Sequence, residues 1–100
     1  MNAKVIETVV FKLAENVSEE AFINTTEAVS IFLKQSPGFI SRRLSKSEDG
    51  TWLEHIEWAS LEEAKAASKD FMSQQSLMPY MQSIDPESVV MTHQDLALSA

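Results

Sequence analysis

The chain has 100 residues, of which 44% are hydrophobic, with a formal net charge of −7 at pH 7 and no cysteine. This length predicts one domain, residues 1–100, with a single core. The acidic balance argues against a nucleic-acid partner and against an anionic membrane surface, and the lack of cysteine excludes disulfides, thiolate nucleophiles and cysteine-ligated metals.

The N-terminal segment carries an early glutamate and only a short apolar run, so it does not resemble a secretory signal. No stretch of the sequence approaches the ~20 apolar residues of a membrane-spanning helix. We therefore expect a cytoplasmic protein without a membrane partner.

The first predicted element is a strand over residues 4–13, in which apolar side chains occupy both faces. Asn16 and Ser18 follow it and can cap the start of an amphipathic helix. This helix is predicted to continue to about Gln35, because Pro37-Gly38 then ends it.

Two further strands are predicted over residues 39–46 and 52–59, with Asp49-Gly50 between them. Asp-Gly between two apolar runs favours a β-hairpin with a two-residue loop. Such a loop pairs Glu48 with Thr51 and thereby sets the register of the whole hairpin.

This register places Arg43 on the same face of the hairpin as Glu54 and Trp58. It also places Arg42 opposite Glu57. Because successive side chains of a strand point in opposite directions, we expect the even-numbered residues of the third strand to face the helices and the odd-numbered ones to face away.

Ser60 and Glu63 form the capping-box pattern that begins a second helix. Its periodicity breaks over residues 73–76 and resumes as a short helix with Pro79 in the first turn, where proline is tolerated. A last strand is predicted over residues 88–96.

The predicted order is β-α-β-β-α-β, that of a ferredoxin-like α+β fold with one four-stranded antiparallel sheet and both helices on one side. Two helices cover only one face of a sheet. The other face is apolar at Ile6, Val10 and Leu53, and a soluble monomer seldom exposes such a patch. We therefore predict a homodimer, with the protein itself as partner, in which two of these faces stack.

Three short motifs lie at the junctions between the predicted elements: Pro37-Gly38-Phe39, Asp49-Gly50 and Trp58-Ala59-Ser60-Leu61-Glu62-Glu63-Ala64. Together they resemble the dimeric α+β barrel superfamily, and in particular its small antibiotic-biosynthesis-monooxygenase-like members, from Val5 to Leu96. The resemblance implies a homodimer with a ligand pocket between the helices and the sheet of each subunit.

The resemblance also implies a role for Trp58, which matches a tryptophan at the end of this strand in members that oxidise aromatic polyketides without metal or flavin. We accordingly expect no cofactor. Where such enzymes can carry an asparagine earlier in the strand, this chain has Glu54. The haem-degrading members use an asparagine, a tryptophan and a histidine at places that here hold Val9, Ala67 and Leu77, so haem degradation is not expected.

Glu54, Glu7 and Arg43 are the candidate catalytic residues. A carboxylate buried beside apolar side chains has a raised pKa and can abstract a proton from a phenol or an activated C–H group. An arginine nearby can hold a developing oxyanion. The alternative is a structural ion pair between Arg43 and Glu54, with Trp58 in the core.

The candidate ligand-binding residues have aromatic or methionine side chains, which form adaptable walls around flat apolar ligands. They are Trp58, Phe71, Met78, Tyr80 and Met81. The alternative is that most of them form the buried stripe of a helix without binding a ligand.

His55, Glu57 and His93 are second-choice site residues. Two histidines and a carboxylate suit a non-haem iron, but positions i and i+2 of a strand are a loose ligand spacing, and we predict no metal. We expect instead a histidine at the dimer interface and a cross-strand ion pair between Arg42 and Glu57.

These features predict a homodimeric small-molecule protein. The first hypothesis is a cofactor-independent monooxygenase acting on a small aromatic or quinone-like compound. The alternatives are a non-catalytic ligand-binding or stress-response module that shares only the fold, and a purely structural dimer.

Overall fold

The computed structural model describes residues 3–100. Their helices and strands, in chain order, are β1 (Val5–Phe11), α1 (Glu19–Lys34), β2 (Phe39–Lys46), β3 (Trp52–Trp58), α2 (Leu61–Phe71), η1 (Gln75–Leu77), α3 (Met78–Gln82), η2 (Pro86–Ser88) and β4 (Val90–Asp95), where η marks a 3-10 helix.

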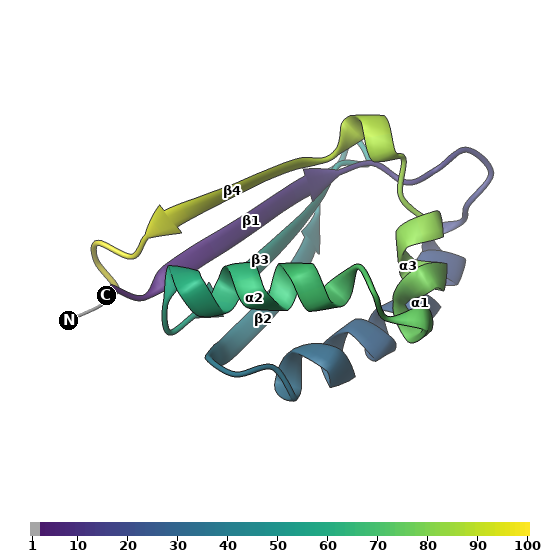
Figure 1. The fold of residues 1–100 in the computed structure, drawn as a ribbon. Coiled ribbons are helices and arrows are strands. Elements are labelled where there is room, and N and C mark those ends of the chain that lie inside the picture. Colours follow the sequence, from purple (N-terminus) through teal and green to yellow (C-terminus); the bar gives the residue numbers. More distant parts are fainter. Residues whose placement is uncertain (1–2) are drawn as a thin grey trace.

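The four strands form one antiparallel sheet in the order β2-β3-β1-β4, and α1 and α2 lie against the same face of it (Figure 1). This arrangement confirms the predicted ferredoxin-like order. The central strands β1 and β3 pair with each other, so the side chains at the middle of the sheet have neighbours on both flanks.

β3 alternates strictly between buried and half-buried side chains. Its even-numbered residues are buried against the helices, as predicted: Trp52, Glu54, Ile56 and Trp58. The Trp52 ring meets α1 edge-on, with its centroid 4.8 Å from that of Phe22. The alternation that brings the tryptophans into the core therefore also buries a carboxylate.

Serine side chains cap the first two α-helices. Ser18 Oγ accepts a hydrogen bond of 3.0 Å from the backbone N–H of Ala21, and Ser60 Oγ accepts one of 3.2 Å from that of Glu63. The second cap agrees with the predicted capping box. At the first cap Ser18 acts rather than Asn16, which adopts a positive φ of 68° in the preceding turn.

Gly38 allows the start of β2 to lie directly against the start of α2. Its φ is +83°, and a Cβ at this position would lie 2.4 Å from the carboxyl carbon of Glu63. Its carbonyl accepts a hydrogen bond of 2.8 Å from the backbone N–H of Ala59. Only glycine combines this backbone conformation with this close approach.

The hairpin between β2 and β3 has a three-residue loop rather than the predicted two-residue loop. The backbone N–H of Ser47 donates to the Thr51 carbonyl at 2.8 Å, and Gly50 closes the loop with a φ of +88°. Three-residue loops that end in a residue of positive φ are a common hairpin type that Asp-Gly also suits. The predicted register is therefore wrong by one residue.

The register shift exchanges the positions of two neighbouring arginines. Arg42 lies opposite Ile56, and Arg43 lies opposite His55. Since side chains alternate between faces, a shift of one residue moves the β2 side chains from Ser41 to Lys46 to the other face of the sheet relative to β3. An irregularity between Phe39 and Ser41 leaves Phe39 opposite Trp58, with their rings 5.9 Å apart. Arg42, and not Arg43, therefore shares the helix side with Glu54.

The C-terminal third agrees with the predicted elements apart from one boundary. The break after α2 is present, and the helix resumes with Pro79 in the first turn of α3. β4 begins two residues later than predicted, because Pro86–Ser88 forms a 3-10 helix. Ser88 Oγ accepts a hydrogen bond of 2.8 Å from the backbone N–H of Lys12, which fixes η2 against the end of β1.

The face of the sheet away from the helices, termed the open face, combines half-buried and exposed side chains. Its apolar residues are Ile6, Val10, Leu53 and Val90, and Val90 is 59% exposed. Within residues 3–100 no helix covers this face (Figure 1). No helix of the same range has the length and apolar composition needed to cross a membrane.

Candidate functional site

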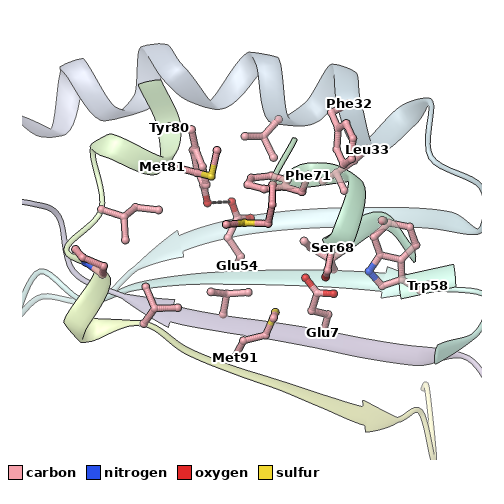
Figure 2. Close-up of a pocket in the computed structure, with 18 residues that line it drawn as sticks. Glu7, Phe32, Leu33, Glu54, Trp58, Ser68, Phe71, Tyr80, Met81 and Met91 are labelled. Carbon is pink, nitrogen blue, oxygen red and sulfur yellow. Dashed lines mark hydrogen bonds between the residues drawn. The ribbon is translucent and has the colours of Figure 1, made fainter. Parts of the chain in front are cut away.

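A cavity of about 370 Å³ lies between the sheet and the helices (Figure 2). Apolar side chains from α1, α2, α3 and β4 form much of its wall, among them Phe32, Leu33, Phe71, Met81 and Met91. Its polar side chains are Glu7, Glu54, Trp58, Ser68 and Tyr80. Mostly apolar cavities of this volume with a few polar groups are typical of small-molecule sites.

The interruption between α2 and α3 shapes the end of the cavity that lies under the helices. α2 ends at Phe71, and the chain turns through η1 before α3 begins. This turn brings Tyr80 and Met81 beside Phe71 in the cavity wall, and the rings of Phe71 and Tyr80 meet edge-on with centroids 6.0 Å apart. A continuous helix would carry α3 past the sheet rather than over it.

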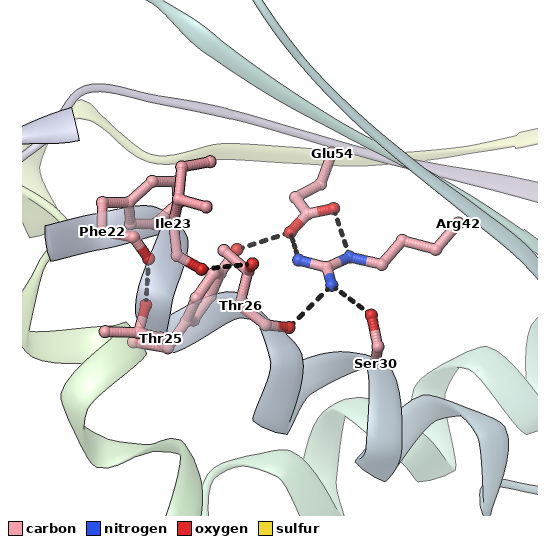
Figure 3. A network of polar contacts seen from close by, with 8 residues as sticks. Phe22, Ile23, Thr25, Thr26, Ser30, Arg42 and Glu54 are labelled. Atoms are coloured by element: carbon pink, nitrogen blue, oxygen red, sulfur yellow. Dashed lines mark hydrogen bonds and ion pairs between the residues drawn. The ribbon is translucent and has the colours of Figure 1, made fainter. Parts of the chain in front are cut away.

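Arg42 holds Glu54 in an ion pair with two hydrogen bonds (Figure 3). Arg42 Nε donates to Oε1 of Glu54 at 2.8 Å, and Nη2 donates to Oε2. Arg42 Nη1 donates to the carbonyl of Thr26 at 3.0 Å and to Ser30 Oγ at 2.9 Å. Burial by itself lowers the pKa of Arg42, but the hydrogen bonds and charge of Glu54 raise it above its ordinary value. The charged pair therefore joins β2, β3 and α1.

Tyr80 completes this group of polar residues, termed the Arg42–Glu54–Tyr80 network. Its hydroxyl donates to Oε2 of Glu54 at 2.8 Å. Burial, followed by the charge of Glu54, raises the pKa of Tyr80 far above its ordinary range, so the phenol remains protonated. Glu54 accepts hydrogen bonds from three donors in all, which leaves it poorly placed to take a proton from a ligand.

Glu7 is the second carboxylate of the cavity, and its environment differs from that of Glu54. It is only 6% exposed, and its Oε1 lies 3.0 Å from Nε2 of His93. Burial raises the pKa of Glu7, although the hydrogen bond and charge of His93 act in the opposite direction. Within residues 3–100 Oε2 of Glu7 makes no hydrogen bond. Glu7 is therefore the carboxylate with a free oxygen at the cavity.

Trp58, which also lines the cavity, has a buried hydrogen-bond donor. The residue is 1% exposed, and its Nε1 is buried without a hydrogen-bond partner among the described residues. The ring nitrogen faces the Glu7 carboxylate (Figure 2). The two groups do not form a hydrogen bond of normal geometry, but the nearby N–H is the smallest of the influences that lower the pKa of Glu7. A buried donor without an acceptor destabilises the fold, and a bound ligand with an acceptor atom would remove this cost.

Arg43 does not lie at the cavity, which corrects its prediction as an oxyanion-binding residue. It is exposed and lies opposite His55, because the three-residue hairpin loop sets the register. The predicted ion pair between Arg42 and Glu57 is also wrong, and Glu57 instead lies 3.9 Å from the ammonium group of Lys4. Arg42 is the buried arginine that sequence reasoning missed, and the alternative loop length was the only signal for it.

Four other predicted site residues do not line the cavity. Met78 is 44% exposed and does not line the cavity. His55 and Glu57 lie on β3 and point toward the open face, opposite to the buried residues. His93 contacts Glu7 on the helix side of the sheet, so it does not share the open face with His55.

The structure brings together Glu7, Glu54, Trp58, Phe71, Tyr80 and Met81 around the cavity. It adds Ser68 of α2 and Met91 of β4 to the lining. The period-2 alternation of the last strand was a signal for Met91, since it placed this residue on the same strand face as His93. Within residues 3–100 no three histidine or carboxylate side chains are grouped so as to bind a metal ion.

No family model matches the sequence, and a search of curated proteins finds no match. Similarity appears in the comparison with solved structures. A candidate antibiotic biosynthesis monooxygenase from Bordetella bronchiseptica is 14% identical in sequence and has a TM-score of 0.77, over 97% of this chain and 100% of that chain.

Two further structures come from Streptomyces. The monooxygenase ActVA-Orf6 of Streptomyces coelicolor, solved in complex with Nanaomycin D, is 12% identical with a TM-score of 0.74, over 98% of this chain and 91% of that chain. SnoaB of Streptomyces nogalater, a cofactor-independent oxygenase, is 14% identical with a TM-score of 0.67, over 98% and 95% of the two chains. The similarity spans almost the whole chain, and at these identities it establishes the architecture rather than the activity. The chain thus has the fold of the antibiotic-biosynthesis-monooxygenase-like proteins, in agreement with the resemblance of its short motifs.

Proposed function

We propose that this protein is a homodimeric monooxygenase that oxidises a small aromatic or quinone-like compound without a bound cofactor. One observation carries the proposal: a mostly apolar cavity is lined by Glu7 and Trp58, and within residues 3–100 neither Glu7 Oε2 nor the buried Nε1 of Trp58 has a hydrogen-bond partner. The likeness to structures described as a cofactor-independent oxygenase and as a monooxygenase supports the same class of reaction.

Glu7 is the general base in this proposal. Its raised pKa, which results from burial, brings its proton affinity closer to that of a base acting near neutral pH. It takes a proton from a phenol or an activated C–H group of the bound compound. The Trp58 N–H then donates to the substrate oxygen on which negative charge develops.

Anthrone shows how the electrons balance in such a reaction. Loss of a proton from its methylene carbon gives an electron-rich enolate, which transfers electrons to dioxygen directly. Over the whole reaction the carbon loses both hydrogens and gains one oxygen atom as a carbonyl, and the other oxygen atom leaves as water with these two hydrogens. Dioxygen accepts all four electrons, so neither a flavin nor a metal has to supply or accept any.

The cavity wall accounts for a preference for flat apolar compounds. Phe71, Tyr80 and Met81 offer aromatic and thioether surface to a ligand ring. In this proposal the Arg42–Glu54–Tyr80 network holds α1 and α3 over the sheet and does not exchange protons with the ligand. Glu7 is therefore preferred to Glu54 as the base.

The proposal includes a homodimer formed through the open face. Ile6, Val10 and Leu53 are half-buried there, and Val90 beside them is largely exposed. Burial of these side chains against a second copy removes an apolar patch that a soluble monomer rarely keeps. The cavity lies on the other side of the sheet, so this dimer leaves it accessible.

The test is oxygen uptake by the purified protein in the presence of anthrone, with chromatography of the anthraquinone formed. We expect one dioxygen consumed for each anthraquinone. Glu7→Gln is expected to lower kcat/KM by about 100-fold or more, because a general base is lost. Trp58→Phe is expected to lower kcat by about 100-fold, the usual effect of removing one oxyanion donor. Glu87→Gln, at an exposed carboxylate of η2, is the matched control and leaves the rate unchanged.

Two results would contradict the proposal. If wild-type protein consumes no oxygen but anthrone raises its Tm, the protein is a non-catalytic ligand-binding module. If anthrone neither reacts nor changes the Tm, the cavity does not take this class of compound.

A further inference from the structure

His93 lies just outside the cavity and contacts the carboxylate that is free to act in it. In the register of β1 and β4, Glu7 and His93 are directly opposite each other. His93 Nε2 lies 3.0 Å from Glu7 Oε1, and His93 is not among the residues that line the cavity. Its side chain is 21% exposed, compared with 8% for that of Glu7. The imidazole therefore reaches Glu7 from the solvent side, while a ligand would reach it from the cavity.

The other groups that face Glu7 do not offer it a positive charge. On β3, the charge of Glu54 raises the pKa of Glu7, and the indole N–H of Trp58 lowers it only slightly. From the helices, the polar side chains that line the cavity are Ser68 of α2 and Tyr80 of α3, and Tyr80 is bound to Glu54. Among the described residues, His93 is thus the one group in direct contact with Glu7 that can carry a positive charge.

The side chains around His93 do not compete with Glu7 for its hydrogen bond. The next side chain on the same face of β4 is Asp95, which borders a separate shallow hollow together with Lys65 of α2. The opposite neighbour of Asp95 in β1 is Val5, which is apolar. The Glu7 carboxylate is therefore the hydrogen-bond partner that the structure provides for His93.

We propose that His93 is a positioning residue for Glu7: it holds the carboxylate through Oε1, so that Oε2 stays turned to the cavity, and it favours the ionised form of the carboxylate. The use of this carboxylate as a base rests on the proposed function, whereas the effect of His93 on its ionisation does not. An N–H at Nε2 donates to Oε1 both in the neutral tautomer and in the imidazolium. Glu7 can therefore gain a proton on Oε2 while this hydrogen bond is kept.

The test is a titration of the Glu7 carboxyl carbon by NMR, with the resonance assigned by its absence in Glu7→Gln. We expect His93→Leu to raise the pKa of Glu7 by about one unit, because both a hydrogen bond and a charge that favour the carboxylate are removed. His93→Gln keeps an N–H donor of similar reach but cannot become charged, so it should raise this pKa by a smaller amount. The matched control is His55→Gln on the open face, which leaves the pKa of Glu7 unchanged.

Circular dichroism shows whether His93→Leu is folded. If it is not, His93→Gln supplies the measurement instead. If the pKa of Glu7 is the same in wild type and in every folded His93 variant, the positioning role is wrong.

The same variants separate this inference from the proposed function. If anthrone is oxidised, the acidic limb of kcat/KM in His93→Leu should move to higher pH by the amount that NMR reports, with little change in KM. Turnover with an unmoved acidic limb rejects the role of His93 and leaves the monooxygenase intact. A shifted pKa of Glu7 in a protein that oxidises nothing rejects the monooxygenase and leaves the role of His93 intact.

Discussion

The hydroxyl of Tyr80 donates a hydrogen bond of 2.8 Å to Oε2 of Glu54, and this bond joins α3 to the centre of the sheet. Glu54 also binds Arg42, whose guanidinium reaches the backbone of α1. One buried carboxylate therefore links α1 and α3, two of the three helical segments that lie over the cavity. The stability of the protein and the shape of the cavity both depend on this group of charges.

Tyr80→Phe should lower the free energy of unfolding by about 2 kcal/mol, because Glu54 loses one of its donors inside the protein. Urea denaturation measures the change. Ser76→Ala, at an exposed serine of η1 shortly before α3, is the control and should have no measurable effect. Equal stabilities of Tyr80→Phe and wild type would mean that the bond to Glu54 contributes nothing to the position of α3.

Arg42→Met should lower the free energy of unfolding by about 3–5 kcal/mol, because it leaves a buried carboxylate without its counter-charge. Arg43→Met, the adjacent and chemically matched substitution, should change it by less than about 0.5 kcal/mol, since Arg43 is exposed. Thermal and urea unfolding of the two variants compare them directly. The reverse order of effects would indicate the register of a two-residue hairpin loop.

Glu7→Gln should stabilise the protein increasingly as the pH rises. The pKa of Glu7 in the folded state is raised above its ordinary value of 4.5, so the folded state binds the proton more tightly than the unfolded state does. The stability of wild type therefore falls as the pH rises through this window, whereas glutamine has no proton to lose. Below pH 4.5 the two proteins should have similar stabilities, and above the folded-state pKa the variant should be the more stable.

Urea denaturation of both proteins at matched concentration, from about pH 4 to pH 8, measures the difference in their free energies of unfolding. The titration of all other groups cancels to first order in this difference. Glu87→Gln serves as the control at an exposed carboxylate and should show no such trend. A difference between Glu7→Gln and wild type that does not change with pH would show that burial leaves the proton affinity of Glu7 unaltered.

Ala67→Leu should close part of the cavity. Ala67 is buried on α2 and lines the cavity, so a larger side chain can extend into free volume and should cost about 1 kcal/mol or less. We expect anthrone to raise the Tm of wild type in the absence of oxygen, and this rise should be lost in Ala67→Leu. Ala66→Leu places the same side chain on the exposed side of α2 and should keep the rise in Tm. Loss of the effect in both variants would point to binding elsewhere.

Leu53→Lys should convert the proposed dimer into a monomer, because it places a charge in the centre of the apolar open face. Size-exclusion chromatography with light scattering measures the mass. Ile31→Lys, at a residue of α1 that is 53% exposed, controls for the added charge and should remain dimeric. A monomeric wild type at micromolar concentration would reject the dimer altogether.

Much of the fold could be predicted because it depends on local patterns. The alternation in β3 placed Trp52, Glu54, Ile56 and Trp58 on the buried face, and the Ser60 cap located the start of α2. These signals are carried by residues close together in the sequence. They also identified several side chains of the cavity before their contacts were known.

The sequence by itself determined the order of the elements, the buried face of β3 and the motifs that resemble a known superfamily, because periodicity, caps and turn residues act over short distances. Only the tertiary structure decided which arginine meets Glu54, since Asp49-Gly50 suits hairpin loops of two or three residues. It alone brought together Glu7 and His93, which are 86 residues apart. Such contacts depend on the packing of the whole chain, and this is why the carboxylate that remains free at the cavity is Glu7.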